Sequence, residues 1–442
     1  MLVSNAPPGR IAAMVKLSSL RKWSVLLSGF VFLAGCGNNA SAPSGAAPQA
    51  AAPTPTPAPK SATPNSFDEV AAHLDPGGDF YLYLSTRQLL AKLDGFINSL
   101  HDTAVSQSGG NKGDMDKAFL VLKDVVQKSG VEDVSGFGAS SFCYSPGLHR
   151  NKIFIHHAPD KGSGLMWSLF GKAPHPLTQL DFLPADTAYA VFGDFDLPQL
   201  IDFTRQEALG SGIPEATQAV NQWQTQFAGI TGLKLDDVLK SLNGSMGMLV
   251  TLDSTSTINV PTGGQALDIP VPRLAIFIAV KNDIIFKQVD KMAGSNPGVI
   301  KVDQPDLHMR TMSLPMVPGL NLRPTIAQWN GYLVLASDDQ LINQMIAVQK
   351  GGPGVKTAPD FVSISANLPA EGNSFAYTSP LFVETVHKIQ GQMVANQPNI
   401  SSTQAQAIQN WFSKYQPMFC GYGVGSILPD GSLTISQGRF TK

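Results

Sequence analysis

The sequence predicts an α+β fold in which large, mostly antiparallel sheets carry helices on one face. Short apolar strands alternate with amphipathic helices along the chain, and the different periods of the two patterns separate these elements. Several apolar runs are joined by tight turns, and strands joined in this way must be antiparallel. At 442 residues, 43% of them hydrophobic, the chain can bury a sizeable core and is long enough for two domains or half-domains.

The recurring unit is a strand, a capping residue and an amphipathic helix. Strands are predicted at residues 80–84, 188–192, 275–280, 332–335 and 375–377. After the first strand, Ser85 precedes a helix with an apolar face at 3.6-residue spacing. This face comprises Leu89, Leu90, Leu93, Phe96, Ile97 and Leu100. Pro-bearing turns at 74–79, 183–187 and 368–373 precede three of the strands, so we interpret the units as an internal structural repeat.

Hairpins are predicted between these units. Asn330-Gly331 joins two apolar runs, and this dipeptide supplies the two positive-φ residues of a type I′ turn. Pro429-Asp430-Gly431 joins the last two strands, and Pro146-Gly147 lies in the loop that follows residues 137–144. The longest helical stretch, residues 381–415, is expected to pack near the C-terminal hairpin.

The start of the chain resembles the leader of a bacterial lipoprotein. A basic region that includes Lys16, Arg21 and Lys22 is followed by an apolar run at 23–33. This run is shorter than the roughly 20 residues that span a bilayer, and it suits the core of a signal peptide. The run ends in Leu33-Ala34-Gly35-Cys36, which resembles the lipobox. The alternative is an ordinary secretory signal with a chance cysteine.

The lipoprotein resemblance implies cleavage before Cys36 and lipid, palmitate included, on its thiol. It places the protein in the cell envelope, anchored on the extracytoplasmic side. Gly37 follows the cysteine instead of Asp, which favours the periplasmic face of the outer membrane over the inner membrane. Met14 stands at the usual distance from such an apolar core, so it is an alternative start of the chain.

Five segments follow from these patterns. We expect a signal peptide at 1–35, the lipidated cysteine and an Ala/Pro-rich linker at 36–65, a first α+β unit at 66–180, a second at 181–366, and C-terminal helices and a hairpin that close the fold at 367–442. The linker composition favours extended polyproline II backbone, which would hold the folded region away from the lipid.

The charge of the chain is unevenly distributed. Residues 1–65 hold five bases and no acid, so the remainder, with 26 bases and 33 acids, has a net charge of −7. An acidic region repels phosphate backbones, which argues against nucleic acid as a partner.

A second resemblance concerns the folded region. Residues 136–142, 148–152 and 183–187 look like segments of uncharacterised bacterial envelope proteins, and Trp329 to Ser337 is similar to a segment of a large bacterial domain-of-unknown-function family. The likeness covers residues 130–380 and rests on structural turns. It implies an envelope location and brings no activity, cofactor or site residue.

Two cysteines remain beyond the lipobox. Cys143 and Cys420 both lie in apolar, strand-like contexts, and an even pair in an oxidising compartment often bridges. A disulfide between them is therefore one expectation, and two buried free thiols are the alternative.

The sequence carries no recognised catalytic, metal-binding or cofactor motif. His156 and His157 are adjacent on a strand and must point to opposite faces, so no metal site is assigned. Asp236-Asp237 and Asp338-Asp339 stand near helix starts, where a capping role is expected. Asp194 and Asp196 are interpreted in the same way.

We therefore expect a non-catalytic envelope lipoprotein that presents its domain to a protein partner, a glycan or an apolar ligand. The second hypothesis is a carrier of lipid or another apolar ligand, which requires a hollow apolar sheet face beneath the helices. The third is a hydrolase, because a triad need not be local in sequence. That hypothesis requires a Ser or Asp beside His149, His156 or His175 in a pocket.

Overall fold

The computed structural model describes residues 66–107, 112–158, 160–260, 267–294, 296–313, 323–395 and 419–440, together with 401, 403–404 and 406–407. The predicted signal peptide, Cys36 and the linker lie outside the described residues. Most of residues 396–415, the second half of the longest predicted helical stretch, also lies outside them. Thr56–Lys442 forms one compact unit, and the description below concerns this unit alone.

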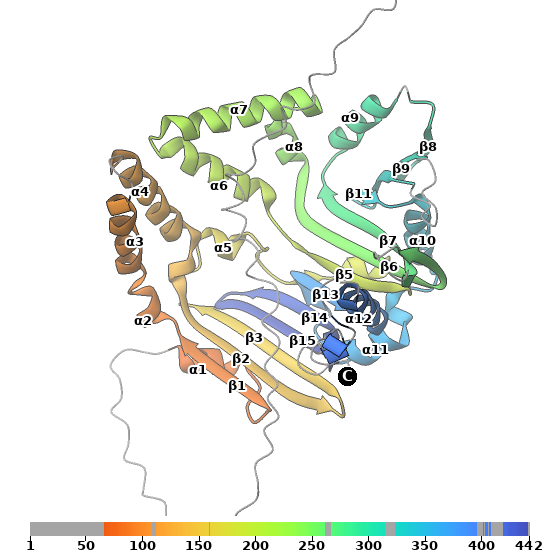
Figure 1. Cartoon of the computed structure of the whole chain (residues 1–442), viewed down its shortest axis with the longest axis horizontal. Coiled ribbons are helices and arrows are strands. Elements are labelled where there is room, and N and C mark those ends of the chain that lie inside the picture. Colours follow the sequence, from red (N-terminus) through yellow and green to blue (C-terminus); the bar gives the residue numbers. More distant parts are fainter. Residues whose placement is uncertain are drawn as a thin grey trace, which may run out of the picture. The chain divides into compact units, whose positions relative to one another are not determined.

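Thirteen strands of the described residues form one antiparallel sheet (Figure 1). Their order across the sheet is β1-β2-β3-β15-β14-β13-β5-β6-β7-β11-β10-β9-β8. The bounds are β1 Phe80–Ser85, β2 Val134–Ser145, β3 Leu148–His157, β5 Thr187–Asp194, β6 Leu242–Val260, β7 Leu267–Val280, β8 Val299–Gln304, β9 Leu307–Met312, β10 Thr325–Trp329, β11 Tyr332–Ala336, β13 Ser374–Thr378, β14 Phe419–Leu428 and β15 Gly431–Phe440. A second sheet pairs β4 His175–Pro176 with β12 Glu371–Gly372. The predicted α+β class with large antiparallel sheets is confirmed.

The helices come between these strands. Their bounds are α1 Phe67–Ala72, α2 Arg87–Leu90, α3 Leu93–Gln107, α4 Lys112–Ser129, α5 Leu165–Ser168, α6 Leu197–Gly210, α7 Pro214–Thr231, α8 Leu235–Ser241, α9 Ile284–Ala293, α10 Asp339–Gln349, α11 Pro359–Ser365 and α12 Pro380–Ala395. Each of the five predicted strands is present and is followed by a helix, as the sequence indicates. None of the described helices is long and apolar enough to cross a bilayer.

The C-terminal strands lie in the middle of the sheet. β15 pairs with β3 and β13 pairs with β5, so β13–β15 join the strands of residues 66–180 to those of residues 181–366. A strand, one or more described helices and a hairpin follow one another three times, as β1-β2-β3, β5-β6-β7 and β13-β14-β15. Each lone strand pairs with the first strand of its hairpin. The internal sequence repeat built on the Pro-bearing turns stays a prediction.

The predicted turns close their hairpins. Asn330 and Gly331 have φ angles of 50° and 77°, which a type I′ turn requires at both central positions. They connect β10 to β11, and Trp329 stands opposite Tyr332. Gly147 has a φ of 73° between β2 and β3, and Leu428 stands opposite Gly431 between β14 and β15.

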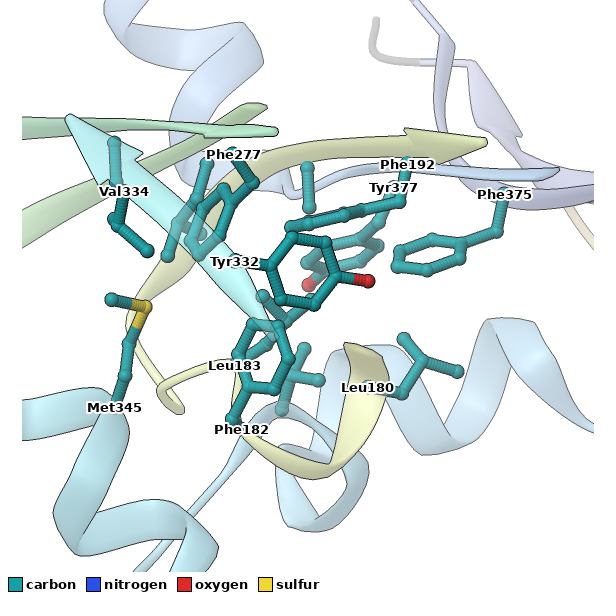
Figure 2. Close-up of a cluster of buried hydrophobic side chains, with 14 of the residues drawn as sticks. Leu180, Phe182, Leu183, Phe192, Phe277, Tyr332, Val334, Met345, Phe375 and Tyr377 are labelled. Carbon is teal, nitrogen blue, oxygen red and sulfur yellow. The ribbon is translucent and has the colours of Figure 1, made fainter. Parts of the chain in front are cut away.

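One face of the sheet, hereafter the core face, is filled with large side chains. Phe192, Phe277 and Phe375 come from three strands and are 2% exposed or less. Phe182 is 1% exposed, and it inserts among them from the segment before β5 (Figure 2). Residues of α10 and α11, including Met345, close this layer. Alternation along the strands puts every second side chain on this face, and the close packing leaves it filled.

Helices lie on both faces, which differs from the predicted one-sided arrangement. Phe382 of α12 stacks on Tyr189 with ring centroids 5.4 Å apart. Tyr189 points away from the core face because it alternates with Ala190 and Phe192 along β5. Helices α8 and α9 pack with Ile278 and Leu333, which are also on this second face. Along the strand direction, α12 therefore covers one end of this second face, and α8 and α9 cover the other. The sequence did not indicate this, because apolar residues on both sides of a strand do not reveal which helix covers which side.

The first predicted helix differs most from expectation. It is divided into α2 and α3, and of its apolar positions Ile97 is buried at 4% exposure. Leu89 and Phe96 are 66% and 60% exposed. The helix ends at Leu90 and restarts at Leu93, so the 3.6-residue stripe does not form one buried face.

Candidate functional site

Two of the three histidines singled out by the hydrolase hypothesis have a candidate catalytic partner. His175 Nε2 lies 3.0 Å from Asp194 Oδ2. Asn373 Nδ2 donates to the same carboxylate oxygen at 3.0 Å and to the Ala173 carbonyl at 2.9 Å. Burial disfavours the charged imidazole, but hydrogen bonds to the Pro176 carbonyl and to Asp194 outweigh it and raise the pKa of His175. No serine or cysteine in the described part of the chain bonds to this imidazole.

The contacts of His175, Asp194 and Asn373 hold the loop before β4 against the sheet. The Asn373 Oδ1 atom accepts from the Ile427 amide at 2.8 Å. A Cβ atom on Gly171 would lie 2.4 Å from both Asn373 Nδ2 and Asp194 Oδ2, so the loop passes close to the pair. Asp194 was expected to cap a helix, but it holds His175 instead. Neighbouring Asp196 does cap α6, because its Oδ1 accepts from the Gln199 amide at 2.9 Å.

His156 pairs with a serine in a buried setting. Its Nδ1 lies 2.5 Å from Ser135 Oγ, and the residue is 4% exposed. Burial lowers the pKa of His156. A triad histidine uses one nitrogen for the serine and the other for a carboxylate, and no carboxylate of the described residues is hydrogen-bonded to His156. Ser66 donates to the Ser135 carbonyl at 2.7 Å, so this cluster attaches the start of the domain to β2.

Neither histidine setting lies in the depression along α7. That depression is lined by Pro214, Thr217, Gln218, Asn221, Gln222, Thr225 and Gln226. His149 approaches Asp79 at 3.8 Å across the end of β3. No group of three histidine, cysteine or acidic side chains within the described ranges could hold a metal ion.

The cysteine pair is not bridged. Cys143 is an exposed free thiol and Cys420 a buried one. Strands β3 and β15 lie between β2 and β14, and three strand spacings of about 4.8 Å separate the two residues by roughly 14 Å. A disulfide requires Cα atoms within about 7 Å. The expected bond therefore fails because of the order of strands, which the spacing of cysteines in the sequence does not encode.

The remaining acidic and glycine positions have structural roles. Asp338 caps α10 by accepting from the Leu341 amide at 2.9 Å. Asp236 lies in the first turn of α8 and pairs with Arg205 at 2.7 Å. Gly164 is the N-cap position of α5, so residues 162–164 form a loop that leads into a short helix.

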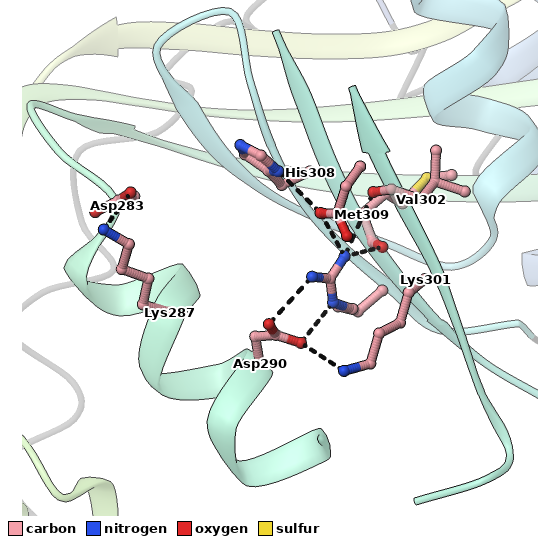
Figure 3. A network of polar contacts seen from close by, with 9 residues as sticks. Asp283, Lys287, Asp290, Lys301, Val302, His308 and Met309 are labelled. Atoms are coloured by element: carbon pink, nitrogen blue, oxygen red, sulfur yellow. Dashed lines mark hydrogen bonds and ion pairs between the residues drawn. The ribbon is translucent and has the colours of Figure 1, made fainter. Parts of the chain in front are cut away.

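A charged network secures the β8 edge of the sheet (Figure 3). Arg310 is 7% exposed, and its Nε donates to Asp290 Oδ1 at 2.6 Å while Nη1 donates to Asp303 Oδ1 at 3.0 Å. Lys301 Nζ adds a contact of 3.3 Å to Asp290. The Arg310 hydrogen bonds lower the pKa of Asp290 to about 2. Every charged group of this network has a partner of opposite charge. Because Asp290 lies on α9, Lys301 and Asp303 on β8 and Arg310 on β9, the network joins these three elements.

The most distinctive surface is the middle of the second sheet face, hereafter the open face. Two rows of residues cross ten strands in register from β1 to β11. The first row is Leu82, Ala139, Ile153, Thr434, Gly425, Ser374, Gly193, Met246, Ile278 and Leu333. The second row is Phe80, Ser141, Asn151, Ser436, Gly423, Ala376, Val191, Met248, Ile276 and Leu335. None of the twenty is charged. Leu333 is buried and Ile278 is partly buried where α8 and α9 pack on them, and none of the other eighteen is buried.

The open face has a small centre and aliphatic flanks. Around β14 and β13 the positions are Gly, Ser, Thr and Ala, whereas Met248, Ile276 and Leu335 form one flank. Ile276 is 38% exposed and Leu335 is 43% exposed. At the other flank Leu82 of β1 is 41% exposed. An uncharged face with accessible aliphatic side chains on both sides has the chemistry of a surface that meets another apolar surface.

The sequence contains one indication of this face. Glycines occupy alternate positions 421, 423 and 425 of a predicted strand, and alternate residues share one face. Because glycine has no side chain, the backbone of this strand itself forms the surface on that face. The rows themselves could not be found, because they depend on which strands pair.

No protein-family model, curated protein or solved structure matches this chain.

Proposed function

We propose that this chain is a cell-envelope lipoprotein, anchored by lipid at Cys36, that binds an apolar segment of another envelope protein on its open face without catalysing a reaction. The observation that carries the proposal is the uncharged open face with accessible aliphatic flanks. The lipobox and the Pro-rich linker support the anchor and the location on the extracytoplasmic side.

The filled core face argues against the carrier alternative. A carrier holds its ligand in a cleft that buries most of the ligand surface. The space beneath α10 and α11 is occupied by Phe182 and its neighbours, so it has no room for an acyl chain. The open face is accessible, but a lipid lying on it would keep much of its surface in water.

A glycan is a weaker candidate for the open face than a protein segment. Sugars need convergent hydrogen-bonding groups together with an aromatic surface for their apolar side. The two rows contain one aromatic residue, Phe80, and one amide side chain, Asn151. Aliphatic side chains around a strip of small residues suit the aliphatic side chains of a protein.

The hydrolase alternative lacks an assembled site. Among the residues that the structure describes, no nucleophile bonds to the His175–Asp194 pair, and no acid bonds to the Ser135–His156 pair, whose histidine is buried. These two pairs are in different parts of the sheet, at the ends of β5 and β3.

The binding surface can be tested in the full-length chain by placing a photo-crosslinking residue at Ile276, at Leu335 or at the control position Ile230. Ile230 lies on α7 and is 77% exposed. We expect both open-face positions to form the same protein adduct, with the crosslink mapped to an apolar peptide, and Ile230 not to form it. Ile276→Lys should lower the affinity for the purified partner at least tenfold, because it places a charge in a desolvated contact.

Equal crosslinking at Ile230 would contradict the open face as the binding surface. Lipid retained by the purified chain would favour the carrier. The anchor is tested separately, since Cys36→Ser should move the protein from the membrane fraction to the soluble fraction, and continued sedimentation with membranes would count against lipidation.

A further inference from the structure

The first strand of the sheet is an edge without the usual protection. β1 is at the end of the strand order and pairs with β2 alone among the described strands. Its sequence, Phe-Tyr-Leu-Tyr-Leu-Ser, contains no charge, proline or glycine, and its pairing with β2 has no bulge across six residues. Edge strands are usually kept from pairing with other chains by such charges, prolines or bulges.

The opposite edge of the same sheet shows the contrast. β8 carries Lys301 and Asp303, which belong to the charged network around Arg310. A strand from another chain placed beside β8 would have to desolvate these charges. The difference between the two edges identifies β1 as the edge open to pairing.

We propose that β1 pairs with β1 of a second copy of this chain, antiparallel and about a two-fold axis. The strand is close to palindromic. With Leu82 opposite its own equivalent, Tyr81 stands opposite Tyr83 and Phe80 opposite Leu84, so each apolar residue meets an apolar residue. A partner of unrelated sequence would match this pattern only by chance, whereas a second copy matches it because an isologous contact uses the same residues twice.

The charge just outside the strand is compatible with the same antiparallel arrangement. Asp79 precedes β1 and stands opposite the second copy's Ser85 in this register, so no like charges meet. After Ser85 the chain turns at Thr86 into α2, so Arg87 lies outside the paired strand.

The side chains of β1 are available for this contact. Phe80 is 46% exposed, Leu82 41% and Leu84 51%. These three belong to the same side of the sheet as the open face, so pairing would join the two open faces through the Leu82 row. Tyr83 is held from the other side, by Phe67 at 5.1 Å between ring centroids and by Ser66 Oγ at 3.0 Å. This contact fixes the strand before a partner arrives.

The test uses the full-length chain in membranes, with Cys143→Ser to remove the exposed native thiol. Directly opposed residues of antiparallel strands have Cα atoms about 4.5–5.5 Å apart, within the range of a disulfide. Leu82→Cys should therefore form a disulfide-linked dimer under mild oxidation. Ile300→Cys is the matched control, because Ile300 is 47% exposed on the edge strand β8.

A second substitution distinguishes specific pairing from collision. Adding Leu84→Lys to Leu82→Cys should reduce the dimer yield about tenfold, because each interface would receive two buried lysines. A Leu82→Cys dimer as scarce as the Ile300→Cys dimer, or a disulfide with a different protein, would overturn the inference. If the dimer forms in a chain that does not sediment with membranes, the anchor fails and the β1 contact stands.

Discussion

Replacing Phe182 by alanine tests the claim that the core face is filled. The ring centroid of Phe182 lies 5.3–6.2 Å from the rings of Phe192, Phe277, Trp329 and Tyr332. Four of these five rings are anchored in the sheet, so they have little freedom to close around a missing side chain. Truncation of a buried Phe costs about 3–5 kcal/mol, more where the site cannot collapse. We expect about 4 kcal/mol.

Thermal unfolding monitored by circular dichroism provides the measurement. Unfolding entropy of about 2.1 cal/mol/K per residue amounts to roughly 0.8 kcal/mol/K for about 375 residues, so 4 kcal/mol lowers the Tm by about 5 °C. Phe170→Ala is the control, because Phe170 is 46% exposed and its loss should change the Tm by no more than about 1 °C. If Phe182→Ala also left the Tm within 1 °C of the parent protein, the face would be loosely packed, and a carrier function would regain support.

Three further predictions concern titration and reactivity. Asp290 has a folded pKa of about 2 against 3.8, so its stabilising effect is present above pH 4 and lost as the pH falls towards 2. The full pKa shift corresponds to roughly 2.4 kcal/mol of unfolding free energy, and solvent screening at 31% exposure reduces this to about 1 kcal/mol. Asp290→Asn should lose this amount at pH 7, as measured by urea unfolding. Asp194→Asn should lower the pKa of His175, as followed by NMR titration of the imidazole, because one of the interactions that raise it is removed. A thiol reagent should modify the exposed Cys143 at least about 100-fold faster than the buried Cys420, whose pKa is raised by burial; equal rates would contradict the burial of Cys420.

Local chemistry made part of the fold predictable. The hairpin at Asn330 and Gly331 follows from two adjacent residues that tolerate positive φ, and the cap at Asp338 follows from one side chain and the amide three residues later. Both depend on contacts within a few residues. The α+β class follows similarly from the alternation of strand and helix patterns.

Long-range pairing could not be read in the same way. β15 pairs with β3 although Gly431 and His156 are separated in sequence by most of the domain. The sequence of neither strand indicates which strand it pairs with. The disulfide expectation failed for this reason, and the open face was not foreseen for the same reason. The predicted stripe on the first helix failed through a local break at Ala91 and Lys92, where the helix ends and restarts.

The residues of the open face do not all bear equally on binding. A Cβ on Gly193 or Gly423 would lie 2.9 Å from the Cβ of Ser374 or Ser436, a separation that real Cβ atoms do not reach without a shift. Close packing between strands therefore requires these glycines whether or not a partner binds. No such requirement explains Ile276. Its apolar side chain is accessible to water, which is unfavourable in free energy, and burial against another apolar surface would remove this exposure. The aliphatic flanks consequently carry the binding argument, and substitutions at the glycines should affect stability before they affect binding.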